Sequence, residues 1–287
     1  TPAGNTVSKS ENKIISTFGR LNYNFKEKYL LTLVFRQDGV SSLAAQNRWG
    51  FFPGLSAGWL VDQESFFQKS SLSKVISSLK PRISYGLNGN VNGIGNYDVQ
   101  GVYGSQGNYN GQGGFLNTGL VNNNLIWEKS KTLDIGVDLG ILKNKVIFLF
   151  DYFNRETSDL LTGLTLPSYT GFNSVTTNLG TYQNRGIELA INANVIQSPK
   201  GLTWDIGANA SLVKNKILQL PFNGNENNRQ GGLQVYDPVS KQVIWVGGLQ
   251  EGRSLGDIYA YEQVSIFKDD AEVAAIAGNR YLARMSL

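Results

Sequence analysis

Four aromatic residues are the side chains best suited to bind a ligand, and they lie in segment 88–124. Ten glycines and ten asparagines fill 20 of its 37 positions, and Asp98 is its only charged residue. Aromatic faces beside amide groups can stack on and hydrogen-bond neutral polar solutes such as glycans or peptides. The same composition also fits a glycine-rich surface loop whose rings only pack against the protein, so both interpretations stay open. The candidate substrate-binding residues are Tyr97, Tyr103, Tyr109 and Phe115.

Catalytic chemistry is poorly represented in the chain. The 287 residues include no histidine and no cysteine, which excludes histidine-containing triads, disulfides, and imidazole or thiolate metal sites. Ser71 and Lys74 have the S-x-x-K spacing of penicillin-binding enzymes, but the accompanying S-D-N and K-T-G motifs are missing. Asp134 and Asp138 would lie about 13 Å apart along a strand, too far for a glycosidase pair, which favours solvated charges facing a lumen. We therefore expect no enzyme, no catalytic residue, no metal site and no cofactor.

Charge and hydropathy limit the partners further. The 26 Lys and Arg residues against 22 Asp and Glu residues leave a net charge of +4 that is spread along the chain, so no nucleic-acid partner is expected. No uninterrupted run of aliphatic and aromatic residues exceeds the five of 146–150, whereas a spanning helix needs about 20 apolar residues. The mean hydropathy of −0.21 resembles that of a soluble protein. A transmembrane β-barrel gives the same average, because its strands alternate polar and apolar residues.

Eight segments of the chain alternate apolar and polar side chains with a period of two, which predicts β-strands. Most have nine residues or more; ordinary strands average about 5–6 residues, and strands that cross a bilayer need about 9–11. The predicted strands are 15–25, 29–37, 49–61, 79–88, 132–139, 146–155, 186–195 and 202–212. Two further candidates are 241–249 and 255–267.

Short and long connections alternate between these strands, as in a barrel with tight periplasmic turns and long extracellular loops. The short connections are 26–28, 140–144 and 197–201, and the long ones are 38–48, 88–124, 156–176 and the residues from 213 onward. Segment 62–78 is the exception, because it is long where a short turn is expected. Its apolar residues favour a short amphipathic helix at the periplasmic rim.

The alternation also assigns an environment to each face of the strands. Leu, Ile, Val and aromatic side chains would meet lipid, while Asn, Ser, Thr, Gly, Asp and Arg would line a wet lumen. A closed ring of strands satisfies every backbone hydrogen-bonding group where water is missing. Five aromatic residues near strand ends suit either interfacial girdles or ordinary packing: Trp49, Trp59, Trp127, Tyr152 and Trp204.

Six stretches, in the order in which they occur, carry a family resemblance. Two examples are LKPRISYGLNGNVNGIGNY (79–97) and NLGTYQNRGIELAINANVI (178–196). The full set is 21–67, 79–97, 125–161, 178–196, 202–220 and 252–275. Together they resemble the SusC/RagA-type TonB-dependent outer-membrane transporters of Bacteroidetes.

The resemblance implies an all-β fold, an antiparallel transmembrane segment of a 22-stranded barrel that encloses an N-terminal plug. It implies import of oligosaccharides or peptides across the outer membrane of a Gram-negative bacterium, with a SusD-like surface lipoprotein as a lid and outer-membrane lipid around the barrel. Energy would come from the TonB–ExbB–ExbD complex through an N-terminal region, but no signal peptide, TonB box or plug is matched in this chain. We expect a flexible leader or loop remnant at 1–13, a partial barrel of nine to ten strands at 14–275, and a truncated tail at 276–287.

The residues leave two alternatives open. A small self-closed outer-membrane barrel or porin would need its first and last strands to pair with each other. A soluble β-sandwich, such as a glycan-binding module, would need a second layer of protein over the apolar face of the strands.

Overall fold

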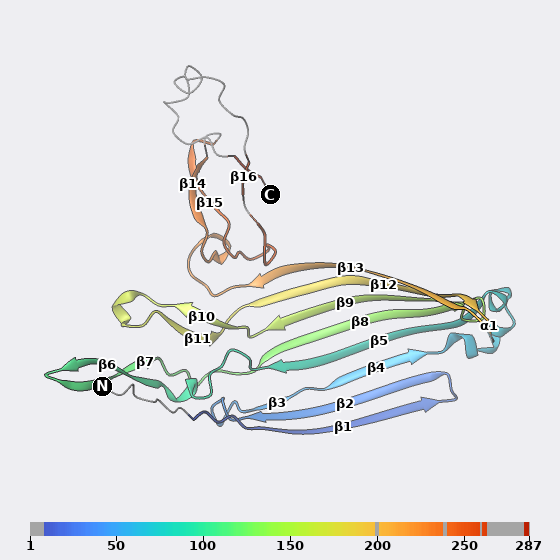
Figure 1. Cartoon of the computed structure of the whole chain (residues 1–287), viewed down its shortest axis with the longest axis horizontal. Coiled ribbons are helices and arrows are strands. Elements are labelled where there is room, and N and C mark those ends of the chain that lie inside the picture. Colours follow the sequence, from blue (N-terminus) through green and yellow to red (C-terminus); the bar gives the residue numbers. More distant parts are fainter. Residues whose placement is uncertain (1–8, 199–200, 238–239, 259, 263–283, 287) are drawn as a thin grey trace, which may run out of the picture. The chain divides into compact units, whose positions relative to one another are not determined.

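The computed structural model describes residues 9–198, 201–237, 240–258, 260–262 and 284–286 (Figure 1). The chain divides into two compact units, Thr1–Lys214 and Asn215–Leu287. Within the described part of the chain, no helix is both long and apolar enough to cross a membrane.

One large sheet dominates the first unit, and all eight predicted strands belong to it. Neighbouring strands pair antiparallel from β1 to β12, and the order β1-β2-β4-β5-β8-β9-β12-β13 follows the chain, with β3 also beside β2. The strands are β1 (Ile14–Phe25), β2 (Tyr29–Val40), β3 (Trp49–Phe51), β4 (Gly54–Trp59), β5 (Ile76–Asn90), β8 (Glu128–Ile141), β9 (Val146–Ser158), β12 (Thr181–Gln197) and β13 (Thr203–Gln219).

A proline divides the predicted strand 49–61 into β3 and β4. Pro53 has no N–H to donate to a neighbouring strand, but the register with β2 is the same on both sides of it. The backbone stays in the sheet there, because Phe52 N donates to Arg36 O at 2.7 Å and Leu87 N donates to Pro53 O at 3.0 Å. The interruption is therefore local, and β3 and β4 act as one strand position.

The short connections gather at one end of the sheet, which we call the short-turn end (Figure 1). Lys26 and Glu27 in the β1–β2 turn have φ of 54° and 55°, a region that is costly for residues other than glycine. The expected short helix is present at this end as α1 (Ser65–Gln68), flanked by two 3₁₀ turns, Val61–Gln63 and Ser71–Lys74. Its amphipathic character is confirmed, because Phe67 is buried while Phe66 is exposed.

The opposite, long-loop end carries two hairpins within segments that were predicted to be loops (Figure 1). Within 88–124, β6 (Val102–Tyr109) pairs with β7 (Gln112–Gly119). Their turn is Asn110-Gly111, with φ of 50° and 78°, which is the Asn-Gly signal of a two-residue hairpin turn. In the next long connection, β10 (Leu161–Thr165) pairs with β11 (Ser174–Asn178).

The strands that follow β13 in the described residues form small two-stranded sheets. β14 (Leu233–Asp237) pairs with β15 (Gln242–Val246), so the candidate strand 241–249 forms a hairpin instead of the ninth barrel strand that we expected. The candidate 255–267 is described only in part, as β16 (Ala260–Glu262), which pairs with β17 (Arg284–Ser286). Most of the expected tail, 276–287, lies outside the described residues.

The apolar face of the large sheet is not covered by protein in the described part of the chain. One row of residues that lie opposite one another across seven strand positions illustrates this: Tyr23, Leu31, Ala57, Ile83, Ile135, Tyr152 and Ile187. Its large side chains are between 37% and 55% exposed. A β-sandwich would bury this row under a second layer. In the same described residues β1 pairs with β2 alone and not with β13, as a self-closed small barrel would require.

Candidate functional site

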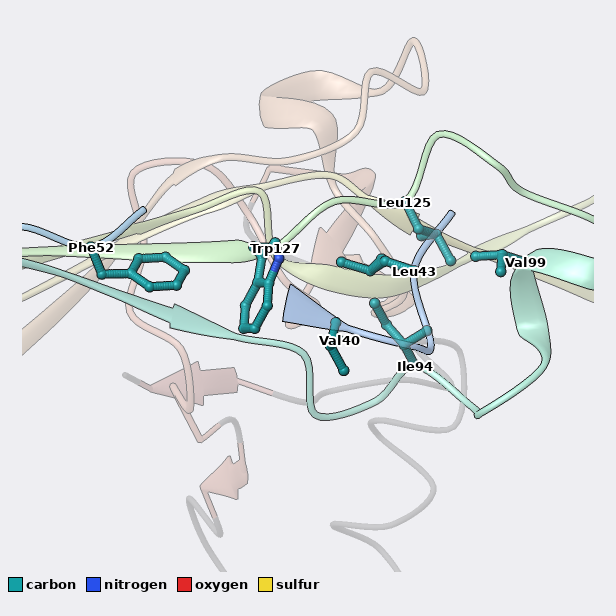
Figure 2. Packing of buried hydrophobic residues seen from close by; sticks show 7 residues of the cluster. All are labelled: Val40, Leu43, Phe52, Ile94, Val99, Leu125 and Trp127. Atoms are coloured by element: carbon teal, nitrogen blue, oxygen red, sulfur yellow. The ribbon is translucent and has the colours of Figure 1, made fainter. Parts of the chain in front are cut away.

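A small buried core fastens the long loops to the end of the sheet (Figure 2). Phe52 and Trp127 pack edge to face with ring centroids 5.3 Å apart, and Trp127 Nε1 donates to Arg48 O at 3.1 Å. Trp127 is therefore a packing residue and not part of an interfacial girdle. The cluster, which we call the loop-anchoring core, consists of Val40, Leu43, Phe52, Ile94, Val99, Leu125 and Trp127.

Two glycines make room for the aromatic ring at the centre of this core. The Phe52 ring lies over Gly50 and Gly89, where any added Cβ would overlap ring atoms. Alternation within the strand does not predict a buried Phe52, because its side chain belongs to the polar face with the even-numbered residues. The glycines on that face, Gly50 and Gly54, were the available signal.

Asparagine side chains join the two long loops to each other. Asn178 Oδ1 accepts from Ile126 N at 2.8 Å, and Asn178 Nδ2 donates to Ile126 O at 2.9 Å and to Asp159 O at 2.8 Å. Asn122 Nδ2 donates to Thr176 O at 2.8 Å. The stretch after β7 is thus held against β11 by amide groups that replace backbone pairing.

Three of the four predicted binding residues belong to the β6–β7 hairpin, and two of them, Tyr103 and Phe115, lie together on it. Tyr103 pairs with Asn117, and Ser105 pairs with Phe115. Residues two apart on a strand share a face, so all four side chains lie on the same side of the hairpin. The Tyr103 and Phe115 side chains are 70% and 75% exposed, which leaves both rings available to a ligand.

The other two predicted residues are placed differently. Tyr97 precedes the hairpin, and its hydroxyl accepts a hydrogen bond from Glu11 N at 3.3 Å. Neighbouring Asn96 exchanges side-chain hydrogen bonds with Ser10 and Asn12, so the described end of the expected leader 1–13 contacts this loop. The backbone of Tyr109 ends β6, but its side chain lies outside the described part of the structure.

A charge network crosses three strands on the polar face of the sheet. Arg82 donates from Nε to Asp138 Oδ1 at 3.0 Å, from Nη1 to Asp134 Oδ1 at 3.1 Å, and from Nη2 to Asp151 Oδ2 at 2.7 Å. Lys80 Nζ lies 2.8 Å from Asp138 Oδ2. Two cations thus face three carboxylates, and all five side chains are only 18–34% exposed. Asp134 and Asp138 were expected to be solvated charges, but both bind the Arg82 guanidinium.

Glycine makes this Arg82 network possible. Gly136 of β8 lies directly between Arg82 of β5 and Asp151 of β9 in the register. A Cβ on Gly136 would overlap the Asp151 carboxylate and lie 2.7 Å from Arg82 Cζ. The missing side chain therefore lets two residues that are two strands apart meet.

The comparisons with known proteins agree with this architecture. Residues 1–269 match the family model described as TonB dependent receptor-like, beta-barrel. The chain belongs to the TonB-dependent receptor β-barrel family. Among curated relatives, TonB-dependent receptor P3 of Formosa agariphila is 34% identical over 263 residues, which are 90% of this chain and 25% of that receptor. TonB-dependent receptor SusC of Bacteroides thetaiotaomicron is 33% identical over 268 residues, 90% of this chain and 26% of SusC.

Solved structures give the same result for the fold. The RagAB peptide importer in its closed-closed state superposes with a TM-score of 0.70 at 25% identity, covering 89% of this chain and 26% of that chain. The open-open state of the same importer gives a TM-score of 0.69. The chain thus spans about a quarter of the length of the relatives that it matches.

Membership in the TonB-dependent receptor family assigns an environment to each face. These receptors are β-barrel proteins of the outer membrane and are not enzymes, which confirms the SusC/RagA resemblance, the fold class and the location expected from the sequence. The exposed apolar face of the sheet therefore meets lipid hydrocarbon, and the face with the Arg82 network lines the barrel interior.

Proposed function

We propose that this chain forms part of the wall and the extracellular loops of an outer-membrane importer of oligosaccharides or peptides. The observation that supports this most strongly is the antiparallel sheet of long strands, lipid-compatible on one face and charged on the other, whose long loops gather at one end. Long loops on a rigid scaffold are the usual place for binding residues.

The proposed substrate class is based on the chemistry of the β6–β7 hairpin. The β6–β7 hairpin presents Tyr103 and Phe115 beside Ser105 and Asn117, without a charged residue. Such a surface favours neutral polar solutes that combine apolar faces with hydrogen-bonding groups. A peptide substrate agrees with the name of the RagAB importer, and oligosaccharides fit the same chemistry.

The proposed importer would work with two protein partners, one on the cell surface and one in the inner membrane. A SusD-like surface lipoprotein would close the barrel from outside, as the SusC and RagAB likeness suggests. The TonB–ExbB–ExbD complex would supply energy through an N-terminal region of the complete receptor. Candidate binding residues remain Tyr97, Tyr103, Tyr109 and Phe115.

Uptake by whole cells tests the proposal. Cells that carry the complete receptor are given fluorescent oligosaccharide and oligopeptide libraries, and accumulation is compared with that in a receptor-deletion strain and in a TonB-deficient strain. We expect one library to accumulate only when both the receptor and TonB are present. Equal accumulation in all three strains for every library would refute the proposal.

A further inference from the structure

An apolar groove is hollowed into the lipid-facing surface near the short-turn end. It is open to the surface, has a volume of about 740 Å³, and crosses β1, β2, β4, β5 and β8. Its floor is low because Ala57 stands between Leu31 and Ile83 in one row of the sheet, and the short Pro81 also lines it. Long side chains therefore surround short ones.

A row of aromatic rings closes the groove towards the rim of the barrel. Successive ring centroids lie 6.3–6.4 Å apart along Tyr23, Phe25, Tyr29, Trp59 and Phe66. Glu64 holds two of these rings by accepting hydrogen bonds from Tyr29 Oη at 2.8 Å and from Trp59 Nε1 at 3.3 Å. Rings with an apolar body and a bonded polar end are typical of the membrane–water interface.

The connections beyond the aromatic row are basic. Segments 26–28, 60–75 and 142–145 contain six lysines, Lys26, Lys28, Lys69, Lys74, Lys143 and Lys145, against the three acids Glu27, Asp62 and Glu64, a balance of +3. They lie close together, because Leu60 N donates to Lys28 O and Leu142 N donates to Val75 O. Lys26 Nζ lies 5.1 Å from the centroid of the Phe25 ring, beside the groove.

We infer that this groove binds one acyl chain of an anionic glycerophospholipid, whose phosphate lies at the Lys26 turn. An acyl chain matches the apolar floor, and an anionic headgroup complements the basic connections. A second copy of the chain fits less well, since a two-fold contact through this patch would place the lysines of both copies face to face. The inference requires only the outer-membrane location of the sheet, so it does not depend on what the receptor imports.

Trp59 reports directly on the groove. The complete receptor is placed in mixed vesicles in which either phosphatidylglycerol or phosphatidylcholine carries brominated acyl chains that quench tryptophan. The quenching due to Trp59 is obtained by subtracting the fluorescence loss of the Trp59→Phe variant from that of the unaltered receptor. We expect phosphatidylglycerol to compete about fivefold better than phosphatidylcholine for this site, the preference that one lysine near a headgroup gives. Trp204, exposed on β13, is measured in the same way with Trp204→Phe and should show no preference.

Two variants separate the headgroup from the acyl chain. Lys26→Asn keeps a residue that tolerates positive φ and should reduce the preference towards unity. Ala57→Leu should fill the floor and weaken quenching by both lipids at Trp59, while its folding is checked by heat-modifiable gel mobility. Equal quenching by both lipids in the unaltered receptor would show ordinary surrounding lipid and overturn the inference. Absence of quenching together with cross-linking between copies at this face would overturn it in favour of a receptor dimer.

Discussion

At the scale of single residues, missing side chains decide where charges and rings can lie. Gly136 leaves the space in which Arg82 meets Asp151, while Gly50 and Gly89 leave the space under the Phe52 ring. A glycine within a strand is less stable than an alanine. At these positions the loss is offset because the neighbouring side chains occupy the space that a Cβ would fill.

The first prediction concerns Gly136→Ala. The added methyl group collides with the Arg82–Asp151 ion pair, so we expect a loss of about 1–3 kcal/mol in the free energy of unfolding of the complete receptor. Denaturant unfolding in lipid vesicles measures it. The matched control is Gly86→Ala on β5, where the nearest atom to a new Cβ is 4.0 Å away; it should be neutral or stabilising by up to about 1 kcal/mol. Equal effects of the two variants would contradict the proposed role of Gly136.

The second prediction concerns pH. Hydrogen bonds from Lys28 and then from Tyr29 lower the pKa of Glu64 below its ordinary value of 4.5. The unfolded chain therefore binds this proton more readily, and the stabilising effect of the carboxylate is present above pH 4.5 and is lost as the pH falls through the lower folded-state pKa. Glu64→Gln should make unfolding less pH-dependent between pH 6 and pH 3, and Lys28→Gln should do so in part. A pH dependence that is unchanged in both variants would contradict this assignment.

The third prediction tests the hairpin residues. Tyr103→Ala and Phe115→Ala each remove an exposed ring from the same hairpin face, and we expect each to lower apparent substrate affinity in uptake about 3- to 10-fold. Tyr169→Ala is the control, because Tyr169 is 88% exposed in the β10–β11 loop. If Tyr169→Ala has the same effect as the hairpin variants, the hairpin face is not the binding surface.

At the scale of elements, the molecule combines a regular sheet with irregular but anchored loops. The loop-anchoring core and hydrogen bonds from side chains to backbone carbonyls join segments that are far apart in sequence, such as 41–48 with 122–127. Loops held in this way can present side chains in a defined geometry, since the entropy of ordering them is offset by burial at their base.

The fourth prediction concerns this anchoring. Leu125 is 1% exposed, so Leu125→Ala should cost about 2–5 kcal/mol of local stability. Limited proteolysis should then cut within 88–124 faster than in the unaltered receptor, while the strands stay protected. Leu116→Ala on β7, where the leucine is 56% exposed, should leave the cleavage rate unchanged. Equal protection in both variants would show that the core does not hold the loop.

At the scale of the whole molecule, the central feature is the division of one sheet into two faces. The fifth prediction uses the absence of cysteine from this chain. Ser84→Cys, on the polar face, should react with a water-soluble maleimide, whereas Ile83→Cys, the neighbouring residue on the apolar face, should not. A bimane attached to Cys at position 83 should be quenched by lipid-phase quenchers alone. Water-soluble labelling at both positions would contradict a lipid-facing wall.

Patterns among residues that are close together in the sequence were sufficient to predict much of this fold. The period of two located all eight positions in the large sheet, and connection lengths separated its two ends, because both properties are local in the chain. The Asn110-Gly111 dipeptide also predicts a hairpin turn, since it favours positive φ, although the composition of 88–124 indicates a loop.

Features that depend on several strands required the tertiary structure. Trp127 and Trp59 both lie near strand ends, but only contacts from distant loops bury the first while the second stays exposed on the lipid face. The Arg82 network depends on register across three strands, which alternation within one strand does not encode. Alternation therefore specifies which face a side chain occupies, whereas its neighbours on that face are set by non-local pairing and by the glycines that let side chains reach across a strand.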